Sequence, residues 1–397
     1  MFFALSLSAQ RHCGNAVKNA QWSADPVFSE RQSAIRHSVR DSRMKDRSSA
    51  KSTPGTVITI PVVFHILYKN NMQNISDAQI NSQLAAMNAD FRRMNSDFSS
   101  VVPQAFQCFA ADMEICFSKA TVDPNGQATT GITRKQVEQN FDLENQYYTA
   151  DGELAWDTSK YLNIWIGRFQ TFGYLGFGTP PAAAGQSYDG LCISYKAVGC
   201  GGSAIAPFDK GRTIVHELGH YFGLSHPWGE DGSDCGEMAN DDGIGDTPSI
   251  NDPHFGLPSY PENSNMCDPD QNGAMFMNFM DYVNDEAMAF FTDDQKAVVQ
   301  NTLENSRLSL LGVKNVSYNS QISIYPNPAD KYVVLRSTSI GLEKAEIFTA
   351  SGQLKKTVEL GRQENIVSLD SFEPGVYFVR IYGKGGELLK SDKIIKK

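Results

Sequence analysis

The 397-residue sequence contains no apolar run that approaches the roughly 18–20 residues needed to cross a membrane. Basic residues are in the minority, with 35 Lys and Arg against 45 Asp and Glu, and the net charge is −10. This balance argues against a general nucleic-acid binder, which carries a basic footprint. Hydrophobic residues make up 41% of the chain, too many for a disordered protein. At about 100–200 residues per domain, the length predicts two or three folded units.

No two cysteines have the C-x-x-C spacing, which argues against a structural zinc site made of thiolates. The chain contains 7 cysteines, more than a cytosolic enzyme usually keeps. Six of them fall between residues 108 and 267 and predict disulfides, whose pairing the sequence leaves open. Proximity favours pairs within residues 108–116 and within residues 192–200. Cys13 stands apart from these six.

The N-terminal part of the chain differs from the rest. Residues 1–10, MFFALSLSAQ, combine a short apolar run with small residues and predict the remnant of a signal peptide. A frayed terminus is the alternative. Residues 11–56 hold nine Lys and Arg but only four Asp and Glu, with few large apolar side chains. This composition predicts a segment that does not fold alone and is either disordered or draped over an acidic surface.

Residues 57–312 alternate between strand and helix signals. Strands are predicted over 57–68 and 161–166, with an edge or a bulge at Pro61. Helices are predicted over three ranges, the first of them capped by a serine, namely residues 76–91, 209–224 and 292–310. The pattern favours an α+β or α/β unit. A polar linker is predicted over 313–321, and the short β-type runs of residues 322–397 predict a small antiparallel sandwich.

The most informative stretch reads HELGHYFGLSH. His216 and His220 are four residues apart, so on a helix both imidazoles project from one face and can bind one ion. Gly223 allows a positive φ, and the turn lets His226 supply a third nitrogen. Three imidazoles leave one position of zinc open for water, as in catalytic sites. Glu217 is placed to take a proton from that water.

These eleven residues resemble the metzincin metallopeptidases, whose extended motif argues against a helix with ordinary surface histidines. The resemblance implies a turn beneath the zinc that contains Met280, and it assigns oxyanion stabilisation to Tyr282. The motifs at residues 246–248 (DTP) and 291–295 (FTxxQ) resemble, within the metzincins, those of the pappalysin family. This resemblance covers residues 57–311. It implies an α+β fold in which a metzincin catalytic domain, a twisted mixed sheet with an active-site helix, precedes a small Ig-like sandwich.

The same resemblance implies a disulfide between Cys235 and Cys267. Cys13 resembles the cysteine switch of matrix metalloproteinases, although the Pro and Asp that flank that motif are absent. A thiolate is a strong zinc ligand and can keep an enzyme latent, which would make residues 11–56 a prosegment. An incidental free thiol and a disulfide partner are the alternatives.

The stretch between Arg212 and Lys296 contains no Lys or Arg but 17 Asp and Glu. Such a Gly-interrupted loop can surround a calcium ion with oxygen. The family resemblance assigns calcium most plainly to Asp242, Asp246 and Thr247. A solvated acidic loop is the alternative.

The resemblance to the bacterial and archaeal members of this family implies cleavage on the amino side of Arg or Lys, with an acidic residue at the base of the S1′ pocket. Asp285 and Glu286 both follow Met280 at a suitable distance, and Glu286 is the closer match. A carboxylate there would pair with a cationic side chain once water is excluded.

Residues 324–328 (IYPNP), 375–379 (GVYFV) and 393–397 (KIIKK) resemble the sorting domain of type IX secretion cargo. The resemblance implies export through the periplasm to the outside or the outer-membrane surface of a Gram-negative bacterium. A generic sandwich that binds substrate or carbohydrate is the alternative.

The sequence thus predicts a secreted zinc endopeptidase that is made as a latent zymogen and cleaves on the amino side of Arg or Lys. Its predicted partners are protein or peptide substrates and the secretion machinery. Two alternatives remain open. One is a surface adhesin or binding protein on a protease scaffold, and the other is a zinc hydrolase of small amides.

Overall fold

The structure is a computed structural model with two compact units, residues 1–311 and 312–397, each described by itself. The described residues are 10–44, 57–171, 173–229, 235, 242–307, 310, 322–337, 342–349, 354–361, 364–383 and 388–397. The predicted signal remnant, apart from Gln10, and the predicted linker therefore lie outside the described residues.

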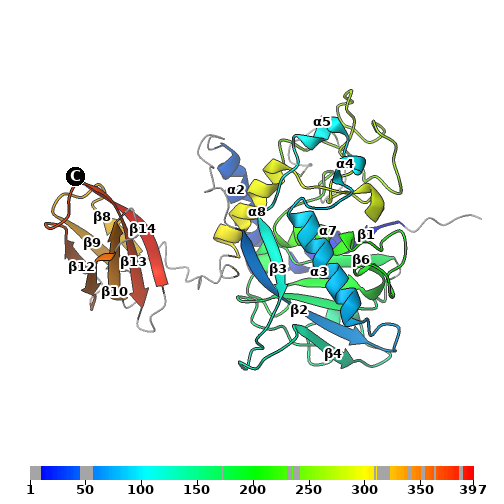
Figure 1. Cartoon of the computed structure of the whole chain (residues 1–397), viewed down its shortest axis with the longest axis horizontal. Coiled ribbons are helices and arrows are strands. Elements are labelled where there is room, and N and C mark those ends of the chain that lie inside the picture. The colour runs from blue at the N-terminus through cyan, green and yellow to red at the C-terminus, as the bar shows by residue number, and fades with distance from the viewer. Residues whose placement is uncertain are drawn as a thin grey trace, which may run out of the picture. The chain divides into compact units, whose positions relative to one another are not determined.

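The first unit is a mixed assembly of strands and helices (Figure 1). Its elements in chain order are β1 (His12–Cys13), α1 (Asn15–Trp22), α2 (Pro26–Met44), β2 (Ile58–Tyr68), α3 (Asp77–Phe91), α4 (Phe98–Val101), α5 (Gln104–Gln107), β3 (Ile115–Lys119), β4 (Ile132–Gln136), α6 (Leu143–Gln146), β5 (Leu162–Gly167), β6 (Tyr174–Gly178), η1 (Pro181–Ala183), β7 (Leu191–Ser194), η2 (Tyr195–Ala197), α7 (Arg212–Tyr221), η3 (Asp285–Ala287) and α8 (Asp293–Asn305), where η marks a short 3-10 helix.

A seven-stranded sheet forms the framework of this unit, in the order β1-β6-β7-β5-β2-β3, with β4 also paired to β2. Strand β2 pairs in parallel with β3, β4 and β5, and β5 pairs in parallel with β7. Strand β6 runs antiparallel to β7, and β1 is added beyond it, parallel to β6. The segment before residue 57 thus supplies a strand to the edge of the sheet.

Strand β2 passes through Pro61 without a bulge, and Pro61 lies where only one side of the strand is paired, as the predicted edge position requires. The amides of Ile58 and Phe64 donate toward β3 and β4. Because successive amides alternate in direction, the position of Pro61 faces β5 instead. Pairing with β5 begins only at Val62, so the amide that proline lacks removes no bond from the ladder.

Two of the three predicted helix starts are confirmed by their caps, whereas α7 begins at Arg212 rather than at residue 209. Ser76 accepts a hydrogen bond from the amide of Gln79 at the start of α3. Thr292 and Gln295 form a reciprocal capping box at the start of α8. Both later helices are shorter than predicted, since α7 ends at Tyr221 and α8 at Asn305.

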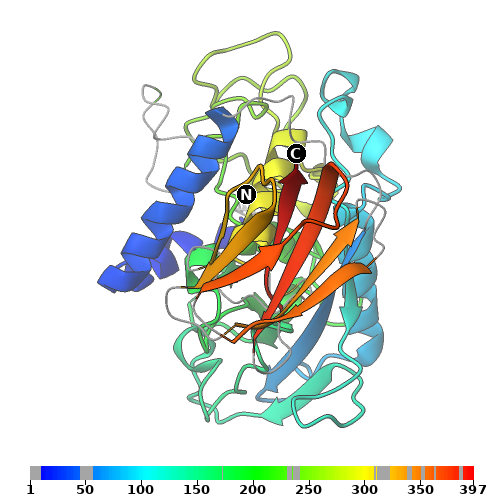
Figure 2. The ribbon, with the colours of Figure 1, turned by 90° about the vertical axis from the view of Figure 1, so that its left-hand side faces the viewer.

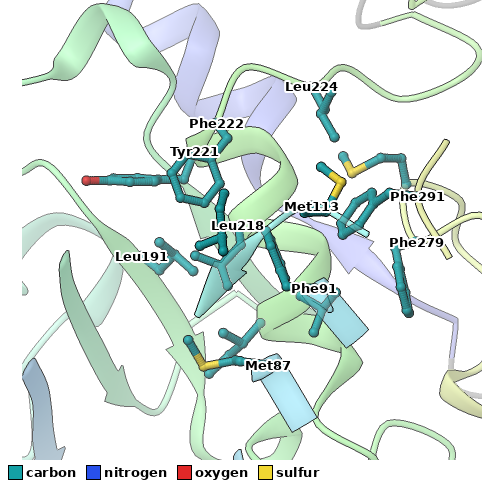
Figure 3. Packing of buried hydrophobic residues seen from close by; sticks show 14 of the residues in the cluster. Met87, Phe91, Met113, Leu191, Leu218, Tyr221, Phe222, Leu224, Phe279 and Phe291 are labelled. Carbon is teal, nitrogen blue, oxygen red and sulfur yellow. The ribbon is translucent and has the colours of Figure 1, made fainter. Parts of the chain in front are cut away.

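Helix α7 is buried on all sides, and all 10 of its residues are inaccessible to solvent. It contacts β6, β7 and α3. Figure 3 shows Leu218 of this helix among Met87 and Phe91 of α3, with Phe279 and Phe291 close by. These residues belong to one large apolar cluster. Such dense packing holds α7 rigidly and fixes the direction of the side chains that it carries.

The segment of residues 10–44 is folded rather than disordered, because it forms β1, α1 and α2. Its contacts with the rest of the unit include aromatic and aliphatic side chains. The Trp22 ring stacks on the Tyr188 ring at a centroid distance of 5.8 Å. Phe28 is buried with Ala182 and Ala183. The basic composition of this segment gave no indication of these apolar contacts.

The cysteines form one disulfide, Cys235–Cys267, in agreement with the family resemblance. The two pairings favoured by proximity are wrong, since all four of the cysteines involved are free, namely Cys108, Cys116, Cys192 and Cys200. Cys192 is buried in β7 whereas Cys200 is exposed. Short sequence separation does not bring two thiols together when one is fixed in a strand and the other faces solvent.

The second unit contains only β-strands among its described elements (Figure 2). The strands are β8 (Ile322–Tyr325), β9 (Tyr332–Ser337), β10 (Leu342–Thr349), β11 (Leu354–Glu359), β12 (Glu364–Ser368), β13 (Gly375–Gly383) and β14 (Leu388–Lys396). They form a four-stranded sheet, β11-β10-β13-β14, and a three-stranded sheet, β12-β9-β8. Val333 and Leu335 of the smaller sheet share one apolar core with Val379 and Ile381 of the larger sheet. The all-β prediction is confirmed.

Candidate metal centre

Three histidines converge at the C-terminal half of α7. The Nδ1 atom of His216 lies 2.8 Å from the carbonyl oxygen of Phe279, and that of His220 lies 2.9 Å from the carbonyl oxygen of Leu224. A carbonyl can only accept, so each Nδ1 carries the hydrogen and each Nε2 presents a lone pair. Such second contacts fix both the tautomer and the ring orientation of a metal ligand.

The Nε2 atoms of His216, His220 and His226 lie between 3.0 and 3.3 Å from one another. Nitrogens bound to one tetrahedral zinc at about 2.0–2.1 Å are separated by roughly 3.3–3.4 Å. Burial, together with the neighbouring charges of His220 and His226, lowers the pKa of His216 well below its ordinary value. The imidazole is therefore kept in the neutral form that a metal requires.

The turn after α7 brings the third histidine into place. Gly223 has a φ of 94°, a left-handed conformation that favours glycine, as the sequence predicts. His226 is buried, and its ring stacks on the Trp228 ring at a centroid distance of 4.6 Å and an angle of 4°. Trp228 was not identified in the sequence. The one sequence signal for this contact was the position of an aromatic residue two places after the third histidine.

Cys13 and Glu217 lie against this cluster. The ligand atoms of Cys13, His216, His220 and His226 all lie within 4.8 Å of one another, the one such group among the described residues. The Sγ atom of Cys13 also lies 3.5 Å from Oε2 of Glu217. Glu217 is 1% exposed, so its carboxylate is held in a dry site.

The turn at residues 278–282 closes the floor of the site. A Cβ atom added to Gly219 would collide with Sδ of Met280, so the methionine packs directly against α7. The Tyr282 ring lies 4.9 Å from the His226 ring and 4.8 Å from the Trp228 ring, centroid to centroid. The structure thus places the tyrosine beside the three histidines.

A buried pocket next to the cluster holds the side chain of Arg11, which is 1% exposed. Its NH2 group donates to Oδ1 of Asp285 at 2.6 Å, and its NH1 group donates to Oγ1 of Thr213 at 3.2 Å. Its Nε donates to the carbonyl of Val283 at 3.3 Å, and the Phe208 ring lies 5.1 Å away. All three nitrogens of the guanidinium are therefore bound.

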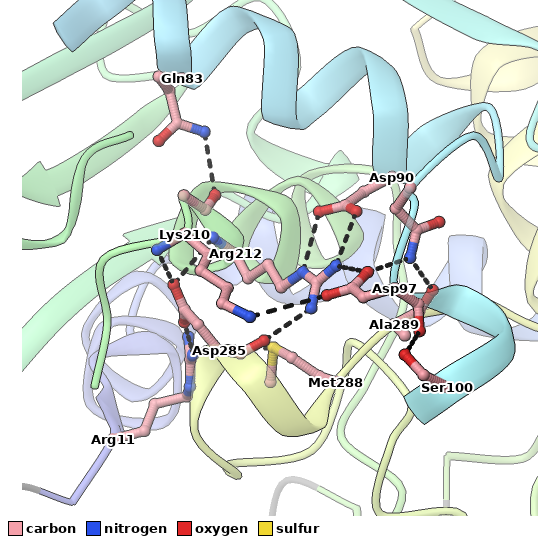
Figure 4. Close-up of polar contacts among 12 residues, drawn as sticks. Arg11, Gln83, Asp90, Asp97, Ser100, Lys210, Arg212, Asp285, Met288 and Ala289 are labelled. Atoms are coloured by element: carbon pink, nitrogen blue, oxygen red, sulfur yellow. Dashed lines mark hydrogen bonds and ion pairs between the residues drawn. The ribbon is translucent and has the colours of Figure 1, made fainter. Parts of the chain in front are cut away.

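The acidic residue of this pocket is fixed from behind (Figure 4). Oδ2 of Asp285 accepts hydrogen bonds from the amides of Lys210 and Arg212 at the start of α7. The Arg212 guanidinium is directed elsewhere, toward the carboxylates of Asp90 and Asp97 and the main-chain oxygen of residue 285. The carboxylate of Asp285 thus keeps one oxygen for a cation in the pocket.

The sequence favoured Glu286 for this position, but its side chain is exposed. Asp285 immediately before it is buried and makes the contact with Arg11. Both residues lie in the short turn η3. Adjacent residues of such a turn point in different directions, and sequence distance from Met280 could not distinguish them.

Two of the three residues predicted to bind calcium are in contact, and the third is bonded elsewhere. Oγ1 of Thr247 donates to the carboxylate of Asp242 at 2.8 Å. Asp246 turns toward α8, where its carboxylate accepts from Oγ1 of Thr292 at 2.7 Å and from the amide of Asp294 at 2.9 Å. Burial, with a smaller contribution from nearby carboxylates, raises the pKa of Asp246.

Comparison with known proteins agrees with this arrangement. The peptidase family described as pregnancy-associated plasma protein-A matches residues 148–304. Mature mirolysin of Tannerella forsythia, solved with a cleaved peptide, is 39% identical, and the match covers 66% of this chain and 100% of that chain with a TM-score of 0.60. The chain belongs to the pappalysin family of metallopeptidases. It is therefore a metalloendopeptidase, and its family implies a catalytic zinc.

Other relatives of this pappalysin match a larger share of its chain. A promirolysin mutant of Tannerella forsythia is 36% identical, and the match covers 76% of this chain and 96% of that chain with a TM-score of 0.65. An extracellular metalloprotease of Arthroderma gypseum is 25% identical over 293 residues, which span 73% of this chain and 83% of that protein.

The second unit of this pappalysin has its own match. The family described as a secretion system C-terminal sorting domain matches residues 323–397. This type IX sorting domain directs the protein to secretion or to the cell surface. None of the described helices is long and apolar enough to span a membrane.

Proposed function

We propose that this pappalysin is made as a latent zymogen and cleaves peptide bonds on the amino side of arginine or lysine. The convergence of the Nε2 atoms of His216, His220 and His226 beside Glu217 carries the proposal. These three histidines would hold the zinc, which supplies a Lewis acid when bound.

The residues of this chain supply the proton transfers and part of the charge stabilisation. Glu217 accepts a proton from the attacking water and then delivers it to the leaving amine. Tyr282 donates its phenolic hydrogen to the oxygen that becomes negative in the transition state.

Cys13 keeps the precursor latent in this proposal. Its sulfur lies within the histidine group and contacts the carboxylate of Glu217. A thiolate in this position would occupy the coordination site that water requires and would also cover the base. The β1 strand, paired with β6, holds the cysteine there.

The pocket around Arg11 is the proposed S1′ pocket, and Asp285 rather than Glu286 is its acidic residue. A bound guanidinium contacts the carboxylate of Asp285, the hydroxyl of Thr213 and the carbonyl of Val283. A substrate arginine would fit these three groups, and a lysine ammonium would fit fewer of them. Arg212 does not neutralise the Asp285 carboxylate, since its guanidinium contacts only the main chain of that residue.

The prosegment crosses this site in the direction opposite to that of a substrate. A substrate presents to the zinc the carbonyl of the residue that precedes its S1′ arginine. In the prosegment, the residue at the histidine group is Cys13, which follows Arg11. Arg11 therefore occupies the pocket, but the peptide bond before it is not presented for cleavage.

Calcium binding by Asp242, Asp246 and Thr247 is part of the proposal. The contact between Thr247 and Asp242 supports it. The three side chains also offer only oxygen atoms as ligands, and calcium prefers oxygen ligands. For the sorting unit, we propose an Ig-like arrangement of its two sheets, supported by their common apolar core.

The Glu217→Ala variant should lose at least about a hundredfold in casein hydrolysis, because general base catalysis contributes roughly 10²–10⁴-fold. Zinc content, measured by atomic absorption, should stay at the wild-type level. The exposed Glu286→Ala variant is the matched control. If the activated wild type with full zinc is as inert as Glu217→Ala, an adhesin on a protease scaffold is the better explanation.

The Cys13→Ala precursor should cleave a fluorogenic peptide before any processing, because the zinc site is no longer blocked. Cys116→Ala, which removes another partly buried free thiol, should remain as latent as the wild type. Intact precursor is verified by mass spectrometry at each time point. Full latency of the Cys13→Ala precursor would remove the cysteine switch from the proposal.

The Asp285→Asn variant of the mature enzyme should lose about a hundredfold in kcat/KM for peptides with arginine at P1′, because a buried cation is left without its partner. Peptides with leucine at P1′ should not lose rate, and Glu286→Gln should behave as the wild type. Profiling on a peptide library measures all of these changes. A wild-type preference for apolar P1′ residues would contradict the pocket assignment.

Withdrawal of calcium with zinc still bound should lower the melting temperature, because the carboxylates of the 242–247 loop lose the cation that offsets their charges. Calorimetry with a calcium-selective chelator measures this shift. An unchanged melting temperature, with zinc content verified, would leave the solvated acidic loop as the explanation.

A further inference from the structure

A buried histidine outside the metal cluster, His254, is linked to the segment of Tyr282 and takes no part in the reaction described above. His254 is 4% exposed, and its Nδ1 atom lies 2.8 Å from Oδ2 of Asp281. Its main-chain amide donates to the other oxygen of the same carboxylate, Oδ1, at 2.8 Å. Asp281 thus binds both the ring and the backbone of His254.

The carboxylate of Asp281 also fixes the residue that follows it. Oδ1 accepts a hydrogen bond from the amide of Tyr282 at 2.7 Å. Asp281 itself is 1% exposed, so water does not compete for its oxygens. One buried carboxylate therefore ties the 254 segment to the main chain that carries the phenol.

Two further contacts hold the same pair of segments together. Gly256 forms a parallel bridge with Val283, and the amide of Asn284 donates to the carbonyl of Gly256 at 3.0 Å. The Phe255 ring lies 6.0 Å from the Tyr282 ring. Because these contacts secure residues 283–284 independently, the pocket wall does not depend on the ring of His254.

We propose that His254 is a positioning residue for Tyr282, acting through the carboxylate of Asp281. The proposal rests on the oxyanion role proposed above for Tyr282. The imidazole holds one carboxylate oxygen, which leaves the other oxygen oriented toward the amide of Tyr282. The phenol is thereby kept beside the histidine group.

The charges around His254 favour this contact. Burial opposes a charge on the ring, but the hydrogen bond and charge of Asp281, with a contribution from Glu262, outweigh burial and raise the pKa of His254. The Nε2 atom of His254 has no hydrogen-bond partner among the described residues. Among the described residues, the bond to Asp281 is therefore the one hydrogen bond of the ring, which also lies 6.2 Å from the Phe276 ring.

Two substitutions of His254 distinguish the effect of its hydrogen bond to Asp281 from the effect of its side-chain volume. An asparagine can place its amide nitrogen near the position of Nδ1 and still donate to Asp281. A leucine of similar size cannot donate, and one oxygen of a buried carboxylate is then left unpaired. The variants His254→Asn and His254→Leu therefore differ in the hydrogen bond more than in the volume of the side chain.

The test measures kcat and KM of the mature enzyme on a peptide with arginine at P1′. His254→Leu should lower kcat about tenfold, because a misplaced catalytic group loses rate without weakening substrate binding. KM and zinc content should be unchanged, and His254→Asn should keep most of the wild-type kcat. Thermal melts establish that both variants are folded.

A double-mutant cycle with Tyr282→Phe decides whether the effect passes through the phenol. In the Tyr282→Phe background, His254→Leu should lower kcat no further. An equal loss in both backgrounds, a rise in KM alone, or loss of zinc would overturn the positioning role. A zinc-loaded wild type that cleaves no peptide would instead contradict the proposed function.

Discussion

The convergence of three imidazole lone pairs on one point is the constraint on which the rest of the catalytic unit depends. The three Nε2 atoms lie within 3.3 Å of one another, which is the spacing that one shared tetrahedral cation requires. They stay in place because the hydrogens on Nδ1 of His216 and His220 are bound by main-chain carbonyls. The burial of α7 and the close packing of Met280 against Gly219 keep those carbonyls within hydrogen-bond distance of the two imidazoles.

The same pocket links latency and specificity in the proposed mechanism. Arg11 and Asp285 form a buried ion pair, and a buried ion pair stabilises only when its remaining donors and acceptors are also satisfied. The hydroxyl of Thr213 and the carbonyl of Val283 satisfy the guanidinium, while two amides satisfy the carboxylate. In the proposed function, removal of the prosegment would leave the carboxylate of Asp285 to bind a cationic residue of a substrate. The inhibitor and the substrate would then be recognised by the same chemistry in opposite chain directions.

Local signals in the sequence were sufficient where the chemistry is local. The spacing of His216 and His220, the positive φ at Gly223 and the cap at Ser76 each depend on a few consecutive residues. The prediction was wrong for the pairing of the four free thiols, and it could not tell which of Asp285 and Glu286 is buried. Cys192 and Cys200 are close in sequence, yet one lies inside the sheet and the other on the surface. The identity of the pocket acid depends on which way two adjacent residues of a short turn face.

The sequence by itself determined which three histidines converge and which carboxylate lies beside them, because both follow from residue type and short-range spacing, and its motifs marked the peptidase and sorting units. Only the tertiary structure decided that Arg11 reaches Asp285, that Trp228 supports His226 and that His254 lies behind Tyr282. Each of these contacts joins segments whose sequence patterns carry no mark of the partner. Their partners are selected by the packing of the whole unit, which a linear pattern does not record.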